Sequence, residues 1–261
     1  MKKKEIFYKV ADIVRAIGGK PSYRYTTAII VAAGSSSRMG FGISKQMALL
    51  EGMPVVVRTL RAYQQCPDID EIIVVAREDE MSSYEEFRNK YNLTKLAHVV
   101  RGGADRQESV LNGLQKVREG ARFVAIADGA RCLTTPDMVT RVCHNAYAFG
   151  CASAACRVVD TVKTANSNGF ISDTEDREKI WLAQTPQVFN TKVYRAAAYS
   201  ARAKGFKATD DNALVERIHR RIKLVDCGQE NIKITTSEDL IRAKLILQAR
   251  RELLERSGDW E

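Results

Sequence analysis

The stretch AAGSSSRMGFGISKQ, residues 32–46, follows directly on the apolar run Thr27–Val31. A run of this kind, rich in β-branched residues, favours a buried strand, and the glycine and serine residues after it favour a loop. Amides of such a loop can point at phosphate oxygens, while its two cations, Arg38 and Lys45, can lie over a reacting phosphorus. The pattern predicts a nucleotide-phosphate site at the end of the first strand.

Two commoner phosphate-binding loops are excluded by the spacing of the glycines. Neither Gly34 nor Gly40 is followed by the Gly-Lys-Ser or Gly-Lys-Thr of a Walker A loop. The G-x-G-x-x-G spacing of a dinucleotide-binding loop is also absent.

Outward from this loop, short apolar runs alternate with helical patterns. Strands are predicted at Thr27–Val31, Glu71–Ala76, Ala97–Arg101 and Arg122–Ala127, and helices at Val55–Gln65, Ser82–Tyr91 and Asp105–Arg118. This alternation predicts a parallel sheet with right-handed crossovers. Because ligands bind beyond the carboxyl ends of such strands, the first loop should meet the loops GGADR (102–106) and ADGAR (127–131) there.

Two acidic residues in these loops have distinct expected roles. Asp105, with Glu108 three residues on, is typical of a capped helix start, and Ser109 then falls in the first turn. Asp128 ends a strand before Gly129, so its carboxylate should face the phosphate site. A lone carboxylate among phosphates needs a hard cation between them, which makes Asp128 a candidate Mg²⁺ ligand.

Composition narrows the class of protein. A chain of 261 residues with 45% hydrophobic content can bury one good core, and its six cysteines include no C-x-x-C pair, as in a reduced cytoplasmic protein. The net charge of +9 fits small polyanions better than nucleic acid, because Lys and Arg are spread along the whole chain without a basic and aromatic block. No run reaches the roughly 18 apolar residues of a membrane-spanning helix.

The domain organisation can also be outlined. Residues 1–24 are expected to be an N-terminal extension with a helix at Glu5–Ile17, residues 25–250 the catalytic domain, and residues 251–261 a tail. A strand is predicted at Ala154–Val162, and the polar stretch after it predicts a projecting hairpin, so that an arm spans about 157–180. Near the end, Thr236 or Ser237 should cap a helix at Glu238–Leu254.

Seven blocks in order resemble the 2-C-methyl-D-erythritol 4-phosphate cytidylyltransferase family over about residues 26–248. They are residues 32–46, GGADRQESVLNG (102–113), ADGAR (127–131), DTVK (160–163), QTPQVF (184–189), TDDNAL (209–214) and NIKITTSEDL (231–240). The resemblance implies a three-layer, Rossmann-like, mostly parallel α/β sheet of the nucleotidyltransferase and glycosyltransferase-A type. It also implies a homodimer in which the β-arm of each subunit completes the substrate site of its partner.

The resemblance further implies site residues for CTP, a sugar-alcohol phosphate and Mg²⁺ or another divalent ion. The catalytic residues would be Arg38, Lys45, Arg177 and Lys233. Nucleotide contacts would come from Ala32, Ala33, Gly34, Ser35, Gly103, Arg106, Ser109, Asp128 and Gly129. Contacts to the acceptor would come from Arg131, Thr161, Arg177, Thr185, Thr209 and Lys233, with Asp128 at the metal.

The implied reaction joins CMP to 2-C-methyl-D-erythritol 4-phosphate in non-mevalonate isoprenoid precursor synthesis and releases pyrophosphate. The acceptor phosphate is already anionic near neutral pH, so no base is needed, and His98, His144 and His219 receive no role. A ribitol 5-phosphate cytidylyltransferase is the closest alternative. A non-catalytic nucleotide-binding regulator is a third, because Ala127, Cys132 and Arg157 stand where the family usually has His, Pro and Pro.

Overall fold

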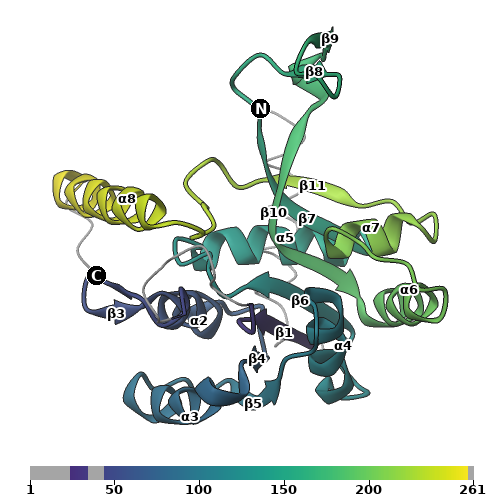
Figure 1. Ribbon diagram of the computed structural model, residues 1–261. Helices are drawn as coiled ribbons and strands as arrows, with labels where there is room; N and C mark the ends of the chain where they lie inside the picture. Colours follow the sequence, from purple (N-terminus) through teal and green to yellow (C-terminus); the bar gives the residue numbers. More distant parts are fainter. Residues whose placement is uncertain (1–23, 35–43, 258–261) are drawn as a thin grey trace, which may run out of the picture.

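A seven-stranded sheet forms the centre of the protein in the computed structural model, which describes residues 24–34 and 44–257 (Figure 1). Its strands are β1 (Thr26–Val31), β4 (Glu71–Ala76), β5 (Leu96–Arg101), β6 (Phe123–Asp128), β7 (Cys151–Arg157), β10 (Trp181–Asn190) and β11 (Lys223–Asp226). The strand order is β11-β7-β10-β6-β1-β4-β5. The helix expected at Glu5–Ile17 lies outside the described residues.

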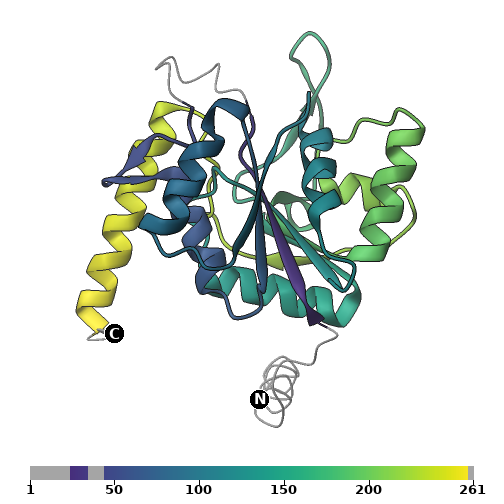
Figure 2. The ribbon, with the colours of Figure 1, turned by 90° about the horizontal axis from the view of Figure 1, so that it is seen from below.

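Helices cover both faces of this sheet, which gives the expected three layers (Figure 2). One core cluster packs α2 (Val55–Gln65), α3 (Met81–Lys90) and α5 (Pro136–Phe149) on one face. The other packs α4 (Arg106–Lys116), α6 (Thr191–Ala203) and α7 (Asp211–Glu216) on the opposite face. The inner strands β1, β4, β6 and β7 are therefore buried on both sides, which explains their nearly continuous apolar sequences, whereas the edge strands β5 and β11 are partly exposed.

The predictions for the first half of the chain agree with the structure to within two residues at each element end. Glu71–Ala76 is a strand and Val55–Gln65 a helix, both with the predicted bounds. The second half differs, because β10 runs antiparallel between β6 and β7 whereas every other pairing in this sheet is parallel.

The strand predicted at Ala154–Val162 was wrong in its bounds. The strand is Cys151–Arg157, an alanine- and cysteine-rich segment of low β-propensity that is buried between β10 and β11. Burial between two neighbours therefore decides this strand. After Arg157 the chain leaves the sheet, so the β-branched residues of 158–162 gain no strand partner.

Residues 157–180 form an arm that stands out from the body of the protein (Figure 1). As predicted, it carries a hairpin, in which β8 (Lys163–Ala165) pairs antiparallel with β9 (Ile171–Thr174). At the base, the Arg157 guanidinium lies 4.2 Å from the centre of the Trp181 ring and donates a 2.6 Å hydrogen bond to the Glu178 carbonyl oxygen. Arg157, one of the three departures from the family pattern, thus fastens the two sides of the arm together.

The last helix, α8 (Ser237–Ser257), begins and ends close to the prediction. Its start is capped as expected, with the Thr236 hydroxyl accepting from the Asp239 N–H, and the Asp239 carboxylate accepts in return from the Thr236 N–H. The helix continues beyond Arg250, so the expected tail begins within a helix, and its side chains from 251 to 256 are exposed.

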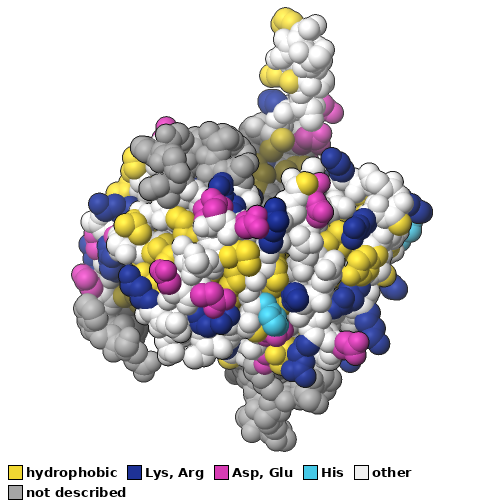
Figure 3. All heavy atoms as spheres, turned by 60° about the horizontal axis from the view of Figure 1, so that its bottom comes forward, with side chains coloured by type: hydrophobic (Ala, Val, Ile, Leu, Met, Phe, Trp, Pro, Cys, Tyr) yellow, Lys and Arg dark blue, Asp and Glu magenta, His cyan; other side chains and the backbone are white. Residues whose placement is uncertain are grey.

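The cysteines are buried, and the charged side chains are mixed on the surface. All six cysteines are free and buried. On the face shown in Figure 3, Lys and Arg lie among Asp, Glu and hydrophobic side chains. Within the described residues, no helix is both long and apolar enough to cross a membrane.

Candidate active site

A cavity of about 430 Å³ lies where the first loop, the GGADR loop and the ADGAR loop converge, beyond the carboxyl ends of β1 and β6. This is the edge of the sheet at which the sequence predicted the site. Eight of its lining residues were expected there: Ala33, Gly34, Lys45, Gly103, Arg106, Ser109, Asp128 and Lys233. Ser35 and Arg38 lie outside the described residues.

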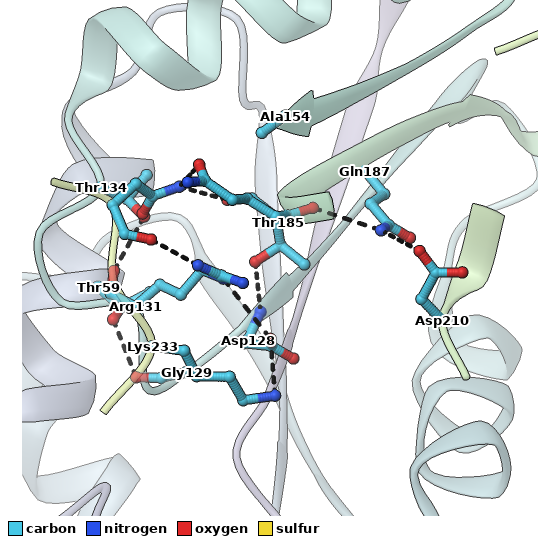
Figure 4. A network of polar contacts seen from close by, with 12 residues as sticks. Thr59, Asp128, Gly129, Arg131, Thr134, Ala154, Thr185, Gln187, Asp210 and Lys233 are labelled. Carbon is cyan, nitrogen blue, oxygen red and sulfur yellow. Dashed lines mark hydrogen bonds and ion pairs between the residues drawn. The ribbon is translucent and has the colours of Figure 1, made fainter. Parts of the chain in front are cut away.

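Asp128 is the centre of charge in this cavity. Its carboxylate lies 2.9 Å from Lys233 Nζ, 3.5 Å from Arg106 Nε and 3.7 Å from Arg131 Nε (Figure 4 shows Lys233 and Arg131). Burial alone would raise the pKa of this carboxyl, but the three cations outweigh it and hold the pKa below its usual value. Asp128 was predicted to be a lone carboxylate. This part of the prediction is wrong, because cations from three different segments surround it.

The backbone around Asp128 is fixed from the neighbouring strand and from α2. The Thr185 hydroxyl, on β10, accepts a 3.1 Å hydrogen bond from the Asp128 N–H, and the Thr59 hydroxyl donates one of 2.9 Å to the Gly129 carbonyl oxygen. A Cβ atom on Gly129 would lie 3.1 Å from Ala32 Cβ and 3.2 Å from Val31 O, which is tighter than ordinary contact. Glycine at this position therefore lets the ADGAR loop pack closely on the first loop.

The GGADR loop is built around the predicted helix cap. Asp105 Oδ1 accepts a 2.8 Å hydrogen bond from the Glu108 N–H, and Glu108 Oε2 accepts one of 2.7 Å from the Ala104 N–H. The buried Ser109 hydroxyl accepts from the Gly103 N–H at 3.0 Å and donates to the Asp105 carbonyl oxygen at 2.8 Å. Ser109 thus shapes the loop from within while it lines the cavity.

Lys45 stands on a short turn that the body of the protein anchors. The Met47 N–H donates a 2.9 Å hydrogen bond to the Ser44 carbonyl oxygen, and the Val56 N–H of α2 donates one of 3.0 Å to the Gln46 carbonyl oxygen. Ser44 and Gln46 are buried while Lys45 is only partly so. The turn therefore directs the lysine toward the cavity.

Asn231, which sequence reasoning did not assign, anchors the segment that carries Lys233. Its buried side chain accepts from the Thr134 hydroxyl at 2.9 Å and donates to the Thr185 carbonyl oxygen at 2.9 Å, and its own carbonyl oxygen accepts from Arg131. The sequence signal was present, because Asn231 opens the NIKITT block. Asn231 thus contacts Arg131 directly and fixes the backbone two residues before Lys233.

Arg106 has a partner that sequence reasoning also missed. Its Nη2 lies 2.7 Å from Oδ2 of Asp211, a fully buried residue at the start of α7. Asp211 belongs to the TDDNAL block, which marked the segment without marking the residue.

Four expected acceptor residues are placed differently. Thr161 and Arg177 lie exposed on the arm, where Arg177 donates a 2.8 Å hydrogen bond to the Val159 carbonyl oxygen, and Thr209 is exposed before α7. None of the three lines the cavity of its own chain. Thr185 is buried, and its hydroxyl accepts a hydrogen bond from the Asp128 N–H, so it holds the backbone of the site and does not line the cavity.

The remaining residues singled out by the sequence lie away from the cavity. Ala127 and Cys132 are buried in the core clusters, so these two departures from the family pattern do not alter the lining of the cavity. None of the three histidines lines it, and His144 pairs with Asp68 at 3.2 Å.

Comparison with known proteins finds relatives of this chain in one family. A sequence model of the 2-C-methyl-D-erythritol 4-phosphate cytidylyltransferase family matches residues 26–249. A protein of that name from Syntrophus aciditrophicus is 44% identical over 222 residues, which are 85% of this chain and 95% of that protein. One from Desulforamulus reducens is 42% identical over 85% of this chain and 96% of its own length.

Solved structures agree with the sequence comparison. The crystal structure of 4-diphosphocytidyl-2C-methyl-D-erythritol synthase from Anaerococcus prevotii matches with a TM-score of 0.77 and 31% identity, covering 86% of this chain and 96% of that one. The Francisella tularensis 2-C-methyl-D-erythritol 4-phosphate cytidylyltransferase matches with a TM-score of 0.69 and 28% identity, covering 85% and 99%. On the sequence blocks, the cavity and these matches together, the chain belongs to the 2-C-methyl-D-erythritol 4-phosphate cytidylyltransferase family.

Proposed function

We propose that this enzyme transfers CMP from CTP to 2-C-methyl-D-erythritol 4-phosphate and that the cavity around Asp128 holds the phosphates of both substrates. The observation that carries the proposal is the convergence of Lys45, Arg106 and Lys233 on one cavity at the carboxyl ends of β1 and β6. Cations fixed in this way neutralise the charge that builds up on a pentacoordinate phosphorus.

The reaction requires alignment and charge relief more than proton transfer. An oxygen of the acceptor phosphate attacks the α-phosphorus of CTP, and the bond from that phosphorus to the bridging oxygen breaks, so that pyrophosphate leaves with the electron pair. Lys45, together with Arg38, stabilises the attacked phosphorus and the leaving group. Lys233 holds the acceptor phosphate in line. Because Lys233 already lies at a carboxylate, it exchanges one anionic partner for another when the substrate binds.

The residues at the cavity fit a divalent cation such as Mg²⁺ that the substrate phosphates help to hold. Magnesium usually takes one or two carboxylates plus phosphate oxygens and water, and Asp128 offers an ionised carboxylate at the cavity. Within residues 24–34 and 44–257, no cluster of three His, Cys, Asp or Glu side chains could hold a metal without substrate. When bound, the ion would withdraw charge from the triphosphate.

Pyrophosphate release in the presence of Mg²⁺ tests which acceptor and which nucleotide the enzyme uses. We expect release with CTP and 2-C-methyl-D-erythritol 4-phosphate, and little with UTP or ATP or without an acceptor. Faster turnover of ribitol 5-phosphate would move the enzyme to the pentitol phosphate alternative. If no acceptor supports release while CTP still binds, the regulator hypothesis replaces catalysis.

The arm supports a homodimeric assembly with shared sites. Phe170 and Ile171, at the arm, are 71% and 67% exposed, which is costly for a projecting hairpin in water. Thr161 and Arg177 lie on the same arm, away from the cavity of their own chain. In a dimer with crossed arms, they would instead reach the acceptor in the partner's cavity.

Mixing two inactive variants distinguishes crossed arms from independent sites. Lys45→Ala removes a residue of the cavity, and Arg177→Ala removes one of the arm. If the arms cross, half of the dimers in an equal co-expressed mixture carry one site with neither substitution, so about one quarter of the wild-type rate should return. Sites built from one chain alone would leave the mixture as inactive as its components. Each variant expressed by itself is the control.

A further inference from the structure

Arg106 is held between two carboxylates, and only one of them belongs to the cavity. Its Nε lies 3.5 Å from Asp128 Oδ1, while its Nη2 lies 2.7 Å from Asp211 Oδ2. Asp128 lines the cavity and Asp211 does not. The Asp211 side chain is 2% exposed and lies on α7, an element with no residue in the cavity lining, so it can reach a ligand only through Arg106.

Asp211 is itself fixed from two sides. The Tyr194 hydroxyl, on α6, donates a 2.5 Å hydrogen bond to its Oδ1. Its backbone N–H and that of Asn212 each donate a 3.1 Å hydrogen bond to Oε1 of Gln187, a fully buried residue of β10. Gln187 is in turn held by Asp210, as Figure 4 shows. The carboxylate therefore has a defined position before any ligand binds.

The Arg106 guanidinium is held at the cavity before a ligand binds. Its Nε faces Asp128 and its Nη2 faces Asp211, while the residue itself lines the cavity. A long side chain such as arginine normally loses rotamer freedom when it grips a phosphate, and that loss weakens binding. Holding the guanidinium in advance avoids that cost at the moment of binding.

The electrostatics point the same way. Burial disfavours the charged guanidinium, but Asp211 and then Asp128 outweigh it and raise the pKa of Arg106 above its ordinary value. A buried carboxylate without its cation would be costly, so the two side chains hold each other in place.

We propose that Asp211 is a positioning residue for nucleotide binding, which acts by aiming the Arg106 guanidinium at the triphosphate. The inference rests on the proposed function of the cavity. If Asp211 has this role, then Tyr194 and Gln187, which hold Asp211 in position, also affect the affinity for CTP.

The test is steady-state kinetics of Asp211→Asn, a change that keeps the shape of the side chain and removes its charge. The KM for CTP should rise about tenfold, as when one charge-assisted hydrogen bond to a ligand is lost, while kcat changes far less. Asn212→Ala is the matched control. Asn212 is the next residue on α7 and donates a 2.9 Å hydrogen bond to the Ser153 hydroxyl, so the control loosens the same helix without touching Arg106.

A double-variant cycle asks whether the effect passes through Arg106. In an Arg106→Gln background, Asp211→Asn should cause no further rise in the KM for CTP. Additive effects, an unchanged KM in Asp211→Asn, or an equal rise in Asn212→Ala would each overturn the inference. If Asp211→Asn does not fold, Tyr194→Phe carries the test, because it keeps the ring packed on Phe189 and removes only the hydroxyl that holds Asp211.

Tyr194→Phe should also raise the KM for CTP, and an unchanged KM would contradict the proposal. CTP binding and turnover by the wild-type enzyme distinguish a failure of this inference from a failure of the proposed function. If it neither binds nor turns over CTP, both are wrong. If it turns over CTP and the variants behave like it, only the role of Asp211 is wrong.

Discussion

Replacing Lys45 with alanine is expected to lower kcat by a factor on the order of 10²–10³, the usual effect of removing one preorganised donor from a transition state. Lys45 lines the cavity and is carried by a turn whose backbone hydrogen bonds do not involve its side chain. The fold should therefore survive the change. Pyrophosphate release at saturating CTP and acceptor measures the effect, and thermal unfolding should give an unchanged midpoint.

Lys90→Ala is a suitable control for this measurement. Lys90 ends α3, where its amine lies 5.4 Å from the centre of the Tyr91 ring and away from the cavity lining. The control should keep wild-type turnover. If Lys45→Ala also turned over at a near-normal rate, Lys45 could not be a catalytic residue.

Asp128→Asn is expected to impair both stability and activity. Its carboxylate is buried among Lys233, Arg106 and Arg131, and removing one member of such a buried group leaves the others uncompensated. The free energy of unfolding in urea should fall by about 3 kcal/mol. Turnover should fall as well, because the variant lacks the carboxylate that we propose as a metal ligand and the anionic partner of Lys233.

The pH dependence of this loss has a defined sign. Despite its burial, the pKa of Asp128 is held below its usual value by Lys233, Arg106 and Arg131. The stabilisation is therefore fully present above the unfolded-state pKa of about 3.9 and is lost as the pH falls below it toward the folded-state pKa. The stability gap between wild type and Asp128→Asn should be largest near neutral pH and should shrink in acid.

An exposed aspartate provides the comparison. Asp79 pairs with Arg77 at 2.7 Å, but its side chain is 64% exposed, and such pairs contribute little. Asp79→Asn should leave the urea midpoint almost unchanged. An equally large loss there, or none in Asp128→Asn, would mean that the group around Asp128 is not a stabilising one.

The parallel half of the fold could be predicted because its signals are local. Runs such as Glu71–Ala76 are apolar, short and flanked by helical patterns, so their type and order follow from periodicity alone. The place of β10 beside β6 depends on pairing between segments more than fifty residues apart, for which a single sequence has no local signal. The bounds of β7 failed for the same reason, because tertiary burial overrides the low propensity of Cys151–Arg157.

The sequence identified the cationic residues of the candidate site, but it did not identify the buried residues that hold them in position. Lys45, Arg106 and Lys233 stood in recognisable blocks and do meet at one cavity. Their partners could not be assigned, because Asn231 and Asp211 act through buried contacts with residues remote in sequence. The roles of Arg177 and Thr161 remain predictions, since they depend on a second subunit.

The burial of every thiol has a practical consequence for spectroscopy. Burial raises the pKa of Cys132 and of Cys227 to about 11, and it raises that of Cys143 well above its ordinary value, so these thiols are protonated and shielded at neutral pH. A cysteine introduced at the exposed Ser167, on the arm, would then react with a maleimide dye far faster than the native thiols. The natural enzyme thus accepts a site-specific label on the arm without any of its own cysteines being removed.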